Sequence, residues 1–438
     1  MLIGWTFDAE TPTILPMAKS SPRVVHVVGA DTPVWKLGVL EALCASSAGV
    51  AGCHGQTPMK SGVARVPVHD DTGSSSTRPR NTVVVHVGGG ALPGPLSVPV
   101  VRVRAPFDLA SLGARTLSRA LDNLNDDVHR PFVLHVWSAT ALAWCLPLAA
   151  AAERRGRRDQ PQRRCCLLVE MDGASDAEPF ARRYRSRPAE SRLAFTCPTA
   201  IVRRRLLENG VATEDCAVIR EFVDFAALNE ARNRNVRAEL GLDASSDTVV
   251  AALPPVVGGS GTFTVAWAAL LLSKIHPGVR LLVPGVGPEA DRVQHLIDSI
   301  RHRHVVRFAP RLSLPELLAA ADLTAYLPDG DAPVTGLVWA MAAARPIVAT
   351  AVPAVAELLA HGHNAWLCKP NSPKDAARRM LQALERPDES QRQAELARSQ
   401  VFQVFGRQRM IEQYDQAYAN LVAGRDVGAG IRDSAMIS

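Results

Sequence analysis
The chain has 438 residues, which is more than a single ordinary hydrophobic core accommodates, so we expect two domains of about 150 to 250 residues each. Hydrophobic residues make up 47% of the sequence and charged residues 21%, and this balance excludes an intrinsically disordered chain. The formal net charge of +6 is too small for a dedicated nucleic-acid-binding protein, although it favours acidic partners or an anionic membrane face.

The cysteines are scattered and form no Cys-x-x-Cys pair, so we expect reduced thiols in the core of a cytoplasmic protein. The start of the sequence has neither a basic segment nor an apolar run, and no window reaches the roughly 18 apolar residues of a membrane span. The longest candidate, 139–152, is interrupted by Pro147 and is interpreted as a buried helix. We therefore expect a soluble protein, or one peripheral to the inner face of a membrane.

In the first half of the chain, short β-rich runs alternate with helical patterns, and this alternation predicts a parallel sheet with crossover helices. The segment 52–80 is rich in Gly, Ser, Thr and Pro and is predicted to be a mobile loop region. The predicted strands are 24–28, 82–87, 132–136 and 166–169, and the predicted helices are 35–44, 139–155 and 199–209.

Two basic clusters lie in this half. The first contains Arg154, Arg155, Arg157 and Arg158, and the second extends over 182–187. They are interpreted either as a solvated helix end and a surface loop or as contacts with an anionic membrane or polyanion.

The second half repeats the alternation and predicts another complete doubly wound sheet. A polar helix is expected over 226–240, a helical segment over 403–422, and a disordered tail over 423–438. The predicted strands are 248–253, 279–283, 305–308, 323–327 and 347–349, and the predicted helices between them are 262–275, 289–301, 314–321 and 338–343.

The segment 335–350 carries the strongest local pattern. Thr335 and Gly336 open a short apolar helix, Arg345 and Pro346 end it, and a buried strand follows at 347–349. This order places a helix N-terminus beside a strand end, where backbone amides and the helix dipole can hold a diphosphate.

Together with the segments around it, this pattern resembles the retaining GT-B glycosyltransferases of family 4, of the "glycosyl transferases group 1" type. The resemblance covers residues of about 190 to 421 and includes, in order, 193–207, 218–224, 237–242, 276–289, 306–308 and 319–323. It implies an α/β GT-B fold, in which two Rossmann-like domains face each other across a cleft. The expected acceptor-side domain is 1–224, the nucleotide-sugar domain is 225–405, and a helix over 406–422 crosses back.

The resemblance also implies a site for the diphosphate, but this chain departs from it. The family usually has an arginine and a lysine five residues apart after the first strand of the second domain, and those positions are Pro255 and Ser260 here. The glycine-rich loop Gly258, Gly259, Ser260 and Gly261 could instead bind the donor through an uncharged nest of backbone amides. A plain flexible turn is the alternative.

The paired acids of the family fall on Asp331 and Trp339. Asp331 is the candidate that orients the donor sugar, with Asp329 as a competing candidate because the loop after Pro328 is one residue short. Trp339 cannot accept a pair of ribose hydroxyls as a carboxylate does, so it either stacks on a ring or packs in the core.

His135 lies at a strand end where the family often has an acceptor-site histidine, although a core or capping histidine is the alternative. The remaining donor-binding candidates are Arg311, Thr335, Gly336 and Leu337. No spacing of Cys or His suits a metal, so we expect neither a metal nor another cofactor.

The resemblance implies transfer of a hexose from a nucleotide sugar to a carbohydrate, lipid-linked or other hydroxyl acceptor, with retention of configuration, in polysaccharide biosynthesis. The alternative is a catalytically inactive relative that serves as a binding or scaffolding subunit, since the charged diphosphate contacts and one acid are missing. An epimerase on the same two-domain plan fits the matched segments less well.

Overall fold

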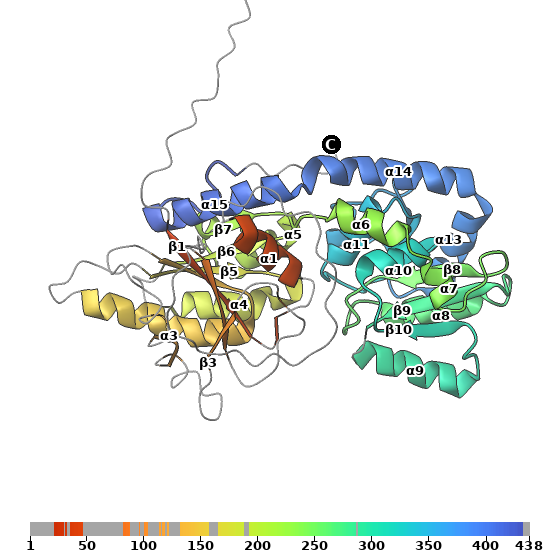
Figure 1. Ribbon diagram of the computed structural model, residues 1–438, viewed down its shortest axis with the longest axis horizontal. Helices are drawn as coiled ribbons and strands as arrows, with labels where there is room; N and C mark the ends of the chain where they lie inside the picture. Colours follow the sequence, from red (N-terminus) through yellow and green to blue (C-terminus); the bar gives the residue numbers. More distant parts are fainter. Residues whose placement is uncertain are drawn as a thin grey trace, which may run out of the picture.

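The computed structural model contains two α/β domains, each built on one parallel sheet, as Figure 1 shows. The expected pair of doubly wound sheets is confirmed. The structure describes residues 22–29, 31–32, 36–46, 82–87, 96, 100–103, 114, 116–118, 121, 132–156, 165–187, 192–285 and 288–431. The predicted loop region 52–80 lies outside them.

The first sheet has seven parallel strands in the order β3-β2-β1-β4-β5-β6-β7. Its strands are almost continuous apolar runs, as expected of a sheet covered on both faces. The short strands β3 and β7 were not predicted. The strands are β1 (Arg23–Val28), β2 (Thr82–Val87), β3 (Val100–Val103), β4 (Phe132–Val136), β5 (Cys165–Glu170), β6 (Leu193–Cys197) and β7 (Cys216–Val218), and the helices are α1 (Lys36–Ser46), α3 (Ala139–Gly156), α4 (Ala177–Arg185) and α5 (Ala200–Glu208).

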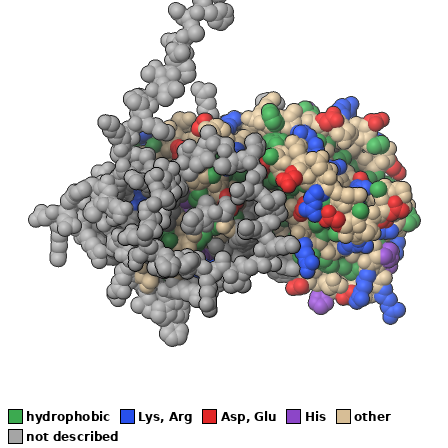
Figure 2. Space-filling model, in the orientation of Figure 1, with side chains coloured by type: hydrophobic (Ala, Val, Ile, Leu, Met, Phe, Trp, Pro, Cys, Tyr) green, Lys and Arg blue, Asp and Glu red, His purple; other side chains and the backbone are tan. Residues whose placement is uncertain are grey.

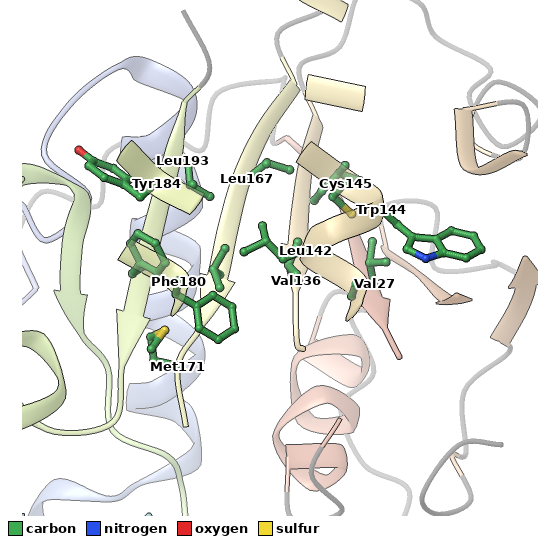
Figure 3. Close-up of a cluster of buried hydrophobic side chains, with 14 of the residues drawn as sticks. Val27, Val136, Leu142, Trp144, Cys145, Leu167, Met171, Phe180, Tyr184 and Leu193 are labelled. Atoms are coloured by element: carbon green, nitrogen blue, oxygen red, sulfur yellow. The ribbon is translucent and has the colours of Figure 1, made fainter. Parts of the chain in front are cut away.

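One face of this sheet is covered by α3, α4 and α5. Their core includes Val27 and Val136 from the strands with Leu142, Trp144 and Phe180 from the helices, as the close-up in Figure 3 shows. The opposite face packs against α1 and the C-terminal helix of the chain. The first sheet is therefore closed by a helix that follows the whole second domain in sequence.

The second sheet has six parallel strands in the order β10-β9-β8-β11-β12-β13. The strands are β8 (Thr248–Ala252), β9 (Val279–Pro284), β10 (Val306–Ala309), β11 (Leu323–Tyr326), β12 (Ile347–Thr350) and β13 (Trp366–Cys368). The helices are α6 (Phe225–Arg232), α7 (Val236–Glu239), α8 (Thr262–Leu272), α9 (Pro288–Ile300), α10 (Leu314–Ala320), α11 (Thr335–Ala342), α12 (Pro353–Ala356), α13 (Pro373–Glu385), α14 (Pro387–Val404) and α15 (Arg407–Ala423).

Capping explains several helix boundaries. The Ser313 hydroxyl and the Glu316 carboxylate form a capping box at the start of α10, and Asp224 accepts from two amides at the start of α6. The single helix predicted over 226–240 is wrong, because the chain leaves the helix at Asn233 and Asn235 starts a new one by accepting from the Ala238 amide.

The chain returns to the first domain through α14 and α15, which lie end to end along one side of both domains in Figure 1. Near the crossing, the Val223 amide donates to the Phe405 carbonyl at 3.1 Å, so both interdomain passages of the chain are in contact. Tyr414, Tyr418 and Leu421 of α15 are buried against the first sheet.

The expected disorder of the tail is wrong for residues 424–431. Val427 is buried in the same core as α15, and its amide donates to the Glu214 carbonyl at 2.8 Å. Apolar burial and a backbone hydrogen bond therefore fix this segment on the first domain, while 432–438 lie outside the described residues.

Candidate functional site
The glycine-rich loop after β8 is held against the loop after β11. A β-turn begins at Val257, whose carbonyl accepts from the Ser260 amide at 3.1 Å, and Gly259 has a φ of 80°, as the third residue of a type II turn does. The Gly259 carbonyl accepts from the Asp329 amide at 3.3 Å. The loop is therefore an ordered turn, and the Ser260 amide is already bonded within it.

Gly261 is the closest point of this contact. Its φ is 76°, and a Cβ atom there would lie 1.7 Å from the Leu327 carbonyl oxygen. The Ser260 side chain is buried and bonded to the Thr262 hydroxyl at 3.0 Å. Only a glycine fits at 261, so the sequence at this position fixes how two loops at the carboxyl edge of the second sheet meet.

The N-terminus of α11 lies at the same edge. Helix α11 begins after Val334, which provides no side-chain cap, and a Cβ atom at Gly336 would lie 2.5 Å from the Pro254 carbonyl oxygen. Within the described residues, no acceptor outside the helix bonds to the amides of Thr335, Gly336 or Leu337. These amides retain the hydrogen-bonding capacity that suits an anion, whereas the Leu337 side chain is buried in the core.

Asp331 faces the first domain. One of its oxygens, Oδ2, accepts from Arg205 Nη2 of α5 at 3.3 Å, and Arg205 also pairs with Glu208. The other oxygen, Oδ1, is buried and has no hydrogen-bond partner among the described residues. The competing candidate Asp329 is exposed at the tip of the same loop. Of the two acids, only Asp331 thus combines a contact across the domain boundary with an unused buried acceptor.

Trp339 packs in the core of the second domain as a partly buried side chain. Beside it lies a hollow of about 10 Å³, which has room for about one water molecule. The packing alternative therefore describes Trp339 in this structure. The hollow lies at the junction of the domains and is lined by Pro198, Glu221, Phe222, Val334, Thr335, Val338, Trp339 and Phe405.

Arg311 is exposed in the loop after β10, at the edge of the second sheet and separated from β8 by β9. Within the described residues, no contact joins it to Asp331 or to the glycine-rich loop. The structure therefore does not bring Arg311 together with the other candidates.

The structure places His135, the candidate acceptor-site and catalytic histidine, in the core of the first domain. Its ring is fully buried beneath α15, where Nδ1 lies 2.8 Å from the Tyr418 hydroxyl and Nε2 lies 3.5 Å from Glu170 Oε2. Burial lowers the pKa of His135, and Glu170 opposes this shift. This position corresponds to the alternative of a core histidine, because β4 directs the side chain into the α15 interface.

A buried ionic network that the sequence interpretation missed lies at the carboxyl edge of the first sheet. Lys36 Nζ, 1% exposed, lies 3.0 Å from both Glu170 Oε1 and Glu221 Oε1, and it donates to the Met171 carbonyl at 2.8 Å. Glu170 Oε2 also accepts from the Tyr414 hydroxyl at 2.7 Å. Charged residues inside apolar runs, such as Lys36 in α1 and Glu170 at the end of β5, were the available signal.

The charges in this network stabilise one another. Burial alone would raise the pKa of Glu170, but the Lys36 ammonium and the hydrogen bonds outweigh burial and lower this pKa to about 2. Burial would likewise lower the pKa of Lys36, and its carboxylate neighbours raise it instead. Both groups are therefore charged at neutral pH.

The network continues into the second domain. The Thr335 hydroxyl at the start of α11 donates to Glu221 Oε2 at 2.7 Å, and Glu221 Oε1 faces Lys36. A second connection is made by Glu357, which accepts from the Ala200 and Ile201 amides at the N-terminus of α5 and from Arg220 Nη2 at 2.7 Å. The first turn of α11 is thus tied to the first domain.

Three further expectations concern metals and membranes. Among the described residues, no group of three or more His, Cys, Asp or Glu side chains is arranged to hold a metal ion. The helices of the described part include none with the length and apolar character to span a bilayer. Arg154 and Arg155 lie at the end of α3 with undescribed side chains, and Arg157 and Arg158 lie outside the described residues.

Residues 263–400 match the model of the glycosyl transferases group 1 family. N-acetyl-alpha-D-glucosaminyl L-malate synthase of Bacillus anthracis is 27% identical over 144 residues, which cover 33% of this chain and 38% of that protein. An exopolysaccharide phosphotransferase of Streptomyces coelicolor is 38% identical over 106 residues, covering 23% of this chain and 11% of that protein. The matches therefore span well under half the length of these curated relatives.

Solved structures match almost the whole chain. HepE of Anabaena, in complex with UDP and glucose, has a TM-score of 0.67 at 16% identity and covers 91% of this chain and 99% of its own. Sucrose-phosphate synthase of Thermosynechococcus elongatus has a TM-score of 0.64 at 13% identity and covers 92% of this chain and 100% of its own. At these identities the likeness concerns the fold.

Proposed function
For a chain with the GT-B fold and a second domain of the glycosyl transferases group 1 type, we propose transfer of a hexose from a nucleotide sugar to a hydroxyl acceptor, with retention of configuration. The fold and the resemblance expected from the sequence are both confirmed. The proposal concerns the donor, the acceptor and the stereochemical course.

One observation carries the proposal. Among the described residues, the amides at the N-terminus of α11 have no acceptor outside the helix and one buried oxygen of Asp331 has no hydrogen-bond partner, and both lie at the carboxyl edge of the second sheet. Amides at a helix N-terminus suit a diphosphate, and a carboxylate oxygen suits the hydroxyl groups of a sugar. The two features together suit the diphosphate and the sugar, which are the two parts of a nucleotide sugar joined by the bond that breaks in the transfer.

In this scheme the amides of Thr335, Gly336 and Leu337 stabilise the negative charge that develops on the diphosphate when the bond to the anomeric carbon breaks. Asp331 accepts hydrogen bonds from the sugar and holds the anomeric carbon in place. The acceptor hydroxyl approaches from the first domain on the same face of the sugar from which the diphosphate departs, so the configuration is retained. As its oxygen bonds to the anomeric carbon and the bond to the diphosphate breaks, its proton passes to the departing diphosphate. Arg205, which now pairs with Asp331, lies on the acceptor side and can pair with the departing diphosphate.

The acceptor is proposed to be a carbohydrate, either free or lipid-linked, used in polysaccharide biosynthesis in the cytoplasm. HepE is described as a complex with UDP and glucose, which fits this proposal. A lipid-linked acceptor would bring the chain to an anionic membrane, and Arg154, Arg155, Arg157 and Arg158 are proposed as contacts on the first domain.

An inactive scaffolding subunit is the second candidate. Pro255 and Ser260 stand where the family has charged donors, and Trp339 stands in place of one of its paired acids. Loss of a single donor to a developing charge typically costs a factor of about a hundred in rate, so several losses could abolish turnover.

Calorimetry separates the two candidates. We expect UDP or GDP to bind at least about tenfold more tightly than the matching monophosphate, because the α11 amides hold the second phosphate. We expect Asp331→Asn to weaken binding of the sugar nucleotide but not of the free diphosphate. The matched control is Asp298→Asn, since Asp298 also pairs with an arginine, Arg303 at 2.8 Å, but on the distant helix α9.

No binding of any nucleotide at millimolar concentration would exclude the transferase and leave the scaffolding subunit. Where transfer occurs, the anomeric configuration of the product, measured by NMR against that of the donor, tests retention.

A further inference from the structure
Helix α8 exposes a continuous apolar stripe. Trp267, Leu271 and Ile275 are spaced four residues apart and are 38%, 39% and 69% exposed. Trp267 and Leu271 lie on one face of α8. Ile275 follows in the turn after the helix ends at Leu272, where the His276 amide still donates to the Leu272 carbonyl at 2.8 Å, so the three side chains lie along one surface. Single exposed apolar residues are ordinary on soluble proteins, but a contiguous patch marks an interaction site.

The neighbouring helices extend this surface. Helix α8 packs against α9 on one side and α13 on the other. Leu296 and Ile300 of α9, and Leu381 and Leu384 of α13, are only partly buried where they pack on the same core. The stripe is therefore the centre of a broader apolar face.

One end of the stripe is strongly basic. The segments 273–280 and 299–307 contain no Asp or Glu. They come together in space, because Lys274 Nζ lies 2.5 Å from His302 Nε2. Figure 2 shows several Lys, Arg and His side chains at the lower right, with Asp or Glu side chains beside them, in the region where Figure 1 places α9. The basic residues of the two segments are Lys274, His276, Arg280, Arg301, His302, Arg303, His304 and Arg307.

Part of this charge is already neutralised. Arg280 pairs with Asp247 at 2.9 Å and Arg303 with Asp298 at 2.8 Å. Among the described residues, no ion pair involves Lys274, Arg301 or Arg307, and Arg307 donates to the Leu240 carbonyl. These side chains therefore leave positive charge beside Ile275, and no acidic group among the described residues neutralises it.

We propose that this face of the second domain docks on an anionic lipid surface. The apolar stripe would enter the boundary between headgroups and acyl chains, while Lys274 and Arg301 pair with anionic headgroups. A second copy of the chain would bring the same positive charges to the contact, whereas an anionic bilayer supplies the opposite charge. The proposal does not depend on sugar transfer.

The topology keeps this surface apart from the candidate site. Helix α8 begins at Thr262, just after Gly261 at the carboxyl edge of the sheet, and the chain runs back toward the amino edge, where Lys274 and Ile275 follow the helix. The lipid-facing end is thus opposite to the α11 N-terminus, and docking leaves the carboxyl edge open to soluble ligands.

Co-sedimentation with lipid vesicles tests the proposal. We expect the wild-type chain to bind vesicles of phosphatidylcholine with phosphatidylglycerol, and to bind vesicles of phosphatidylcholine alone at least about tenfold more weakly. The triple variant Trp267→Ser, Leu271→Ser, Ile275→Ser should lose at least about tenfold in partition coefficient, since insertion of apolar side chains is removed. Lys274→Gln and Arg301→Gln should each lose about fivefold, and added salt should weaken wild-type binding.

The matched control is Phe402→Ser, because Phe402 on α14 is 69% exposed, as Ile275 is, but lies outside the stripe. It should bind as the wild type does, and thermal unfolding should show that all variants remain folded. The proposal is overturned if the wild type does not bind anionic vesicles, or if binding survives the triple variant and is lost on removing Arg154, Arg155, Arg157 and Arg158. It is equally overturned if light scattering shows a dimer that the triple variant dissociates and vesicles are not bound.

Discussion

The first domain contains charged side chains that are almost completely buried and paired with one another. Lys36 and Glu170 are each about 1% exposed and lie 3.0 Å apart. Removing one partner from a buried ion pair typically costs about 3 to 5 kcal/mol, since the other charge is left uncompensated. Glu221 contacts both Lys36 and Thr335. Its position therefore depends on Lys36, whose pairing with Glu170 the protein cannot lose without a large decrease in the free energy of unfolding.

The pH dependence of stability should report Glu170. Its pKa in the folded protein is about 2, below the ordinary value of 4.5, so the unfolded chain binds more protons between these values. The contribution of Glu170 is thus present above pH 4.5 and is lost as pH falls toward 2. We expect the free energy of unfolding of the wild type to fall over this window, and that of Glu170→Gln to change less.

Urea unfolding at a series of pH values would measure both curves. Other groups titrate in both proteins, so the difference between the curves isolates Glu170. Glu395→Gln, at an exposed position of α14, is the control and should follow the wild type. Parallel curves for wild type and Glu170→Gln would contradict the low pKa.

At the scale of single residues, the sequence predicted where a residue lies in the fold better than it predicted which groups surround its side chain. It placed Asp331 and Gly336 at the carboxyl edge of the second sheet, because a local pattern of turn, helix and strand fixes that edge. It could not place the His135 ring, because whether a side chain at a strand end faces the cleft or another helix depends on α15, about 280 residues later. Lys36, Glu170 and Glu221 were missed for the same reason, since they come together only in the folded domain.

Among secondary-structure elements, long apolar strands and well-capped helices were predictable from sequence. β1, β2, β4 and β8 to β12 are runs whose composition alone indicates burial on two faces. β7 has only three residues, and the break between α6 and α7 depends on the Asn235 cap within an otherwise helical pattern. Such features depend on single side-chain contacts or neighbouring strands, which periodicity does not reveal.

The glycine-rich loop provides a matched pair of substitutions. Gly261→Ala should lower the free energy of unfolding by about 2 kcal/mol or more, because the residue has a φ of 76° and the new Cβ would meet the Leu327 carbonyl. Gly258→Ala should change it by no more than about 0.5 kcal/mol, since a Cβ there meets nothing within 4 Å. Denaturant titration of both variants measures the difference, and equal effects would show that the contact with Leu327 is absent in solution.

At the scale of the whole molecule, polar contacts among the described residues join the two domains at three places. One extends from Lys36 through Glu221 to Thr335 at the start of α11, another joins Arg220 and the start of α5 to Glu357, and the third pairs Arg205 with Asp331. The first and the third end on residues of the candidate donor site itself. The relative position of the domains and the geometry of α11 are therefore coupled, which matters for an enzyme whose two substrates would bind to different domains.

The pair Arg220 and Glu357 allows this coupling to be measured. The two side chains are 6% and 15% exposed and 2.7 Å apart, so a double-mutant cycle with Arg220→Met and Glu357→Gln should give a coupling energy of about 1 to 3 kcal/mol. The single substitutions should also let the domains separate, and small-angle scattering should then show a larger radius of gyration. Glu395→Gln on α14 serves as the control that changes neither quantity. Additive single substitutions with an unchanged radius of gyration would mean that the pair does not hold the domains together, and that closure depends on Glu221 and the apolar contacts of Phe405.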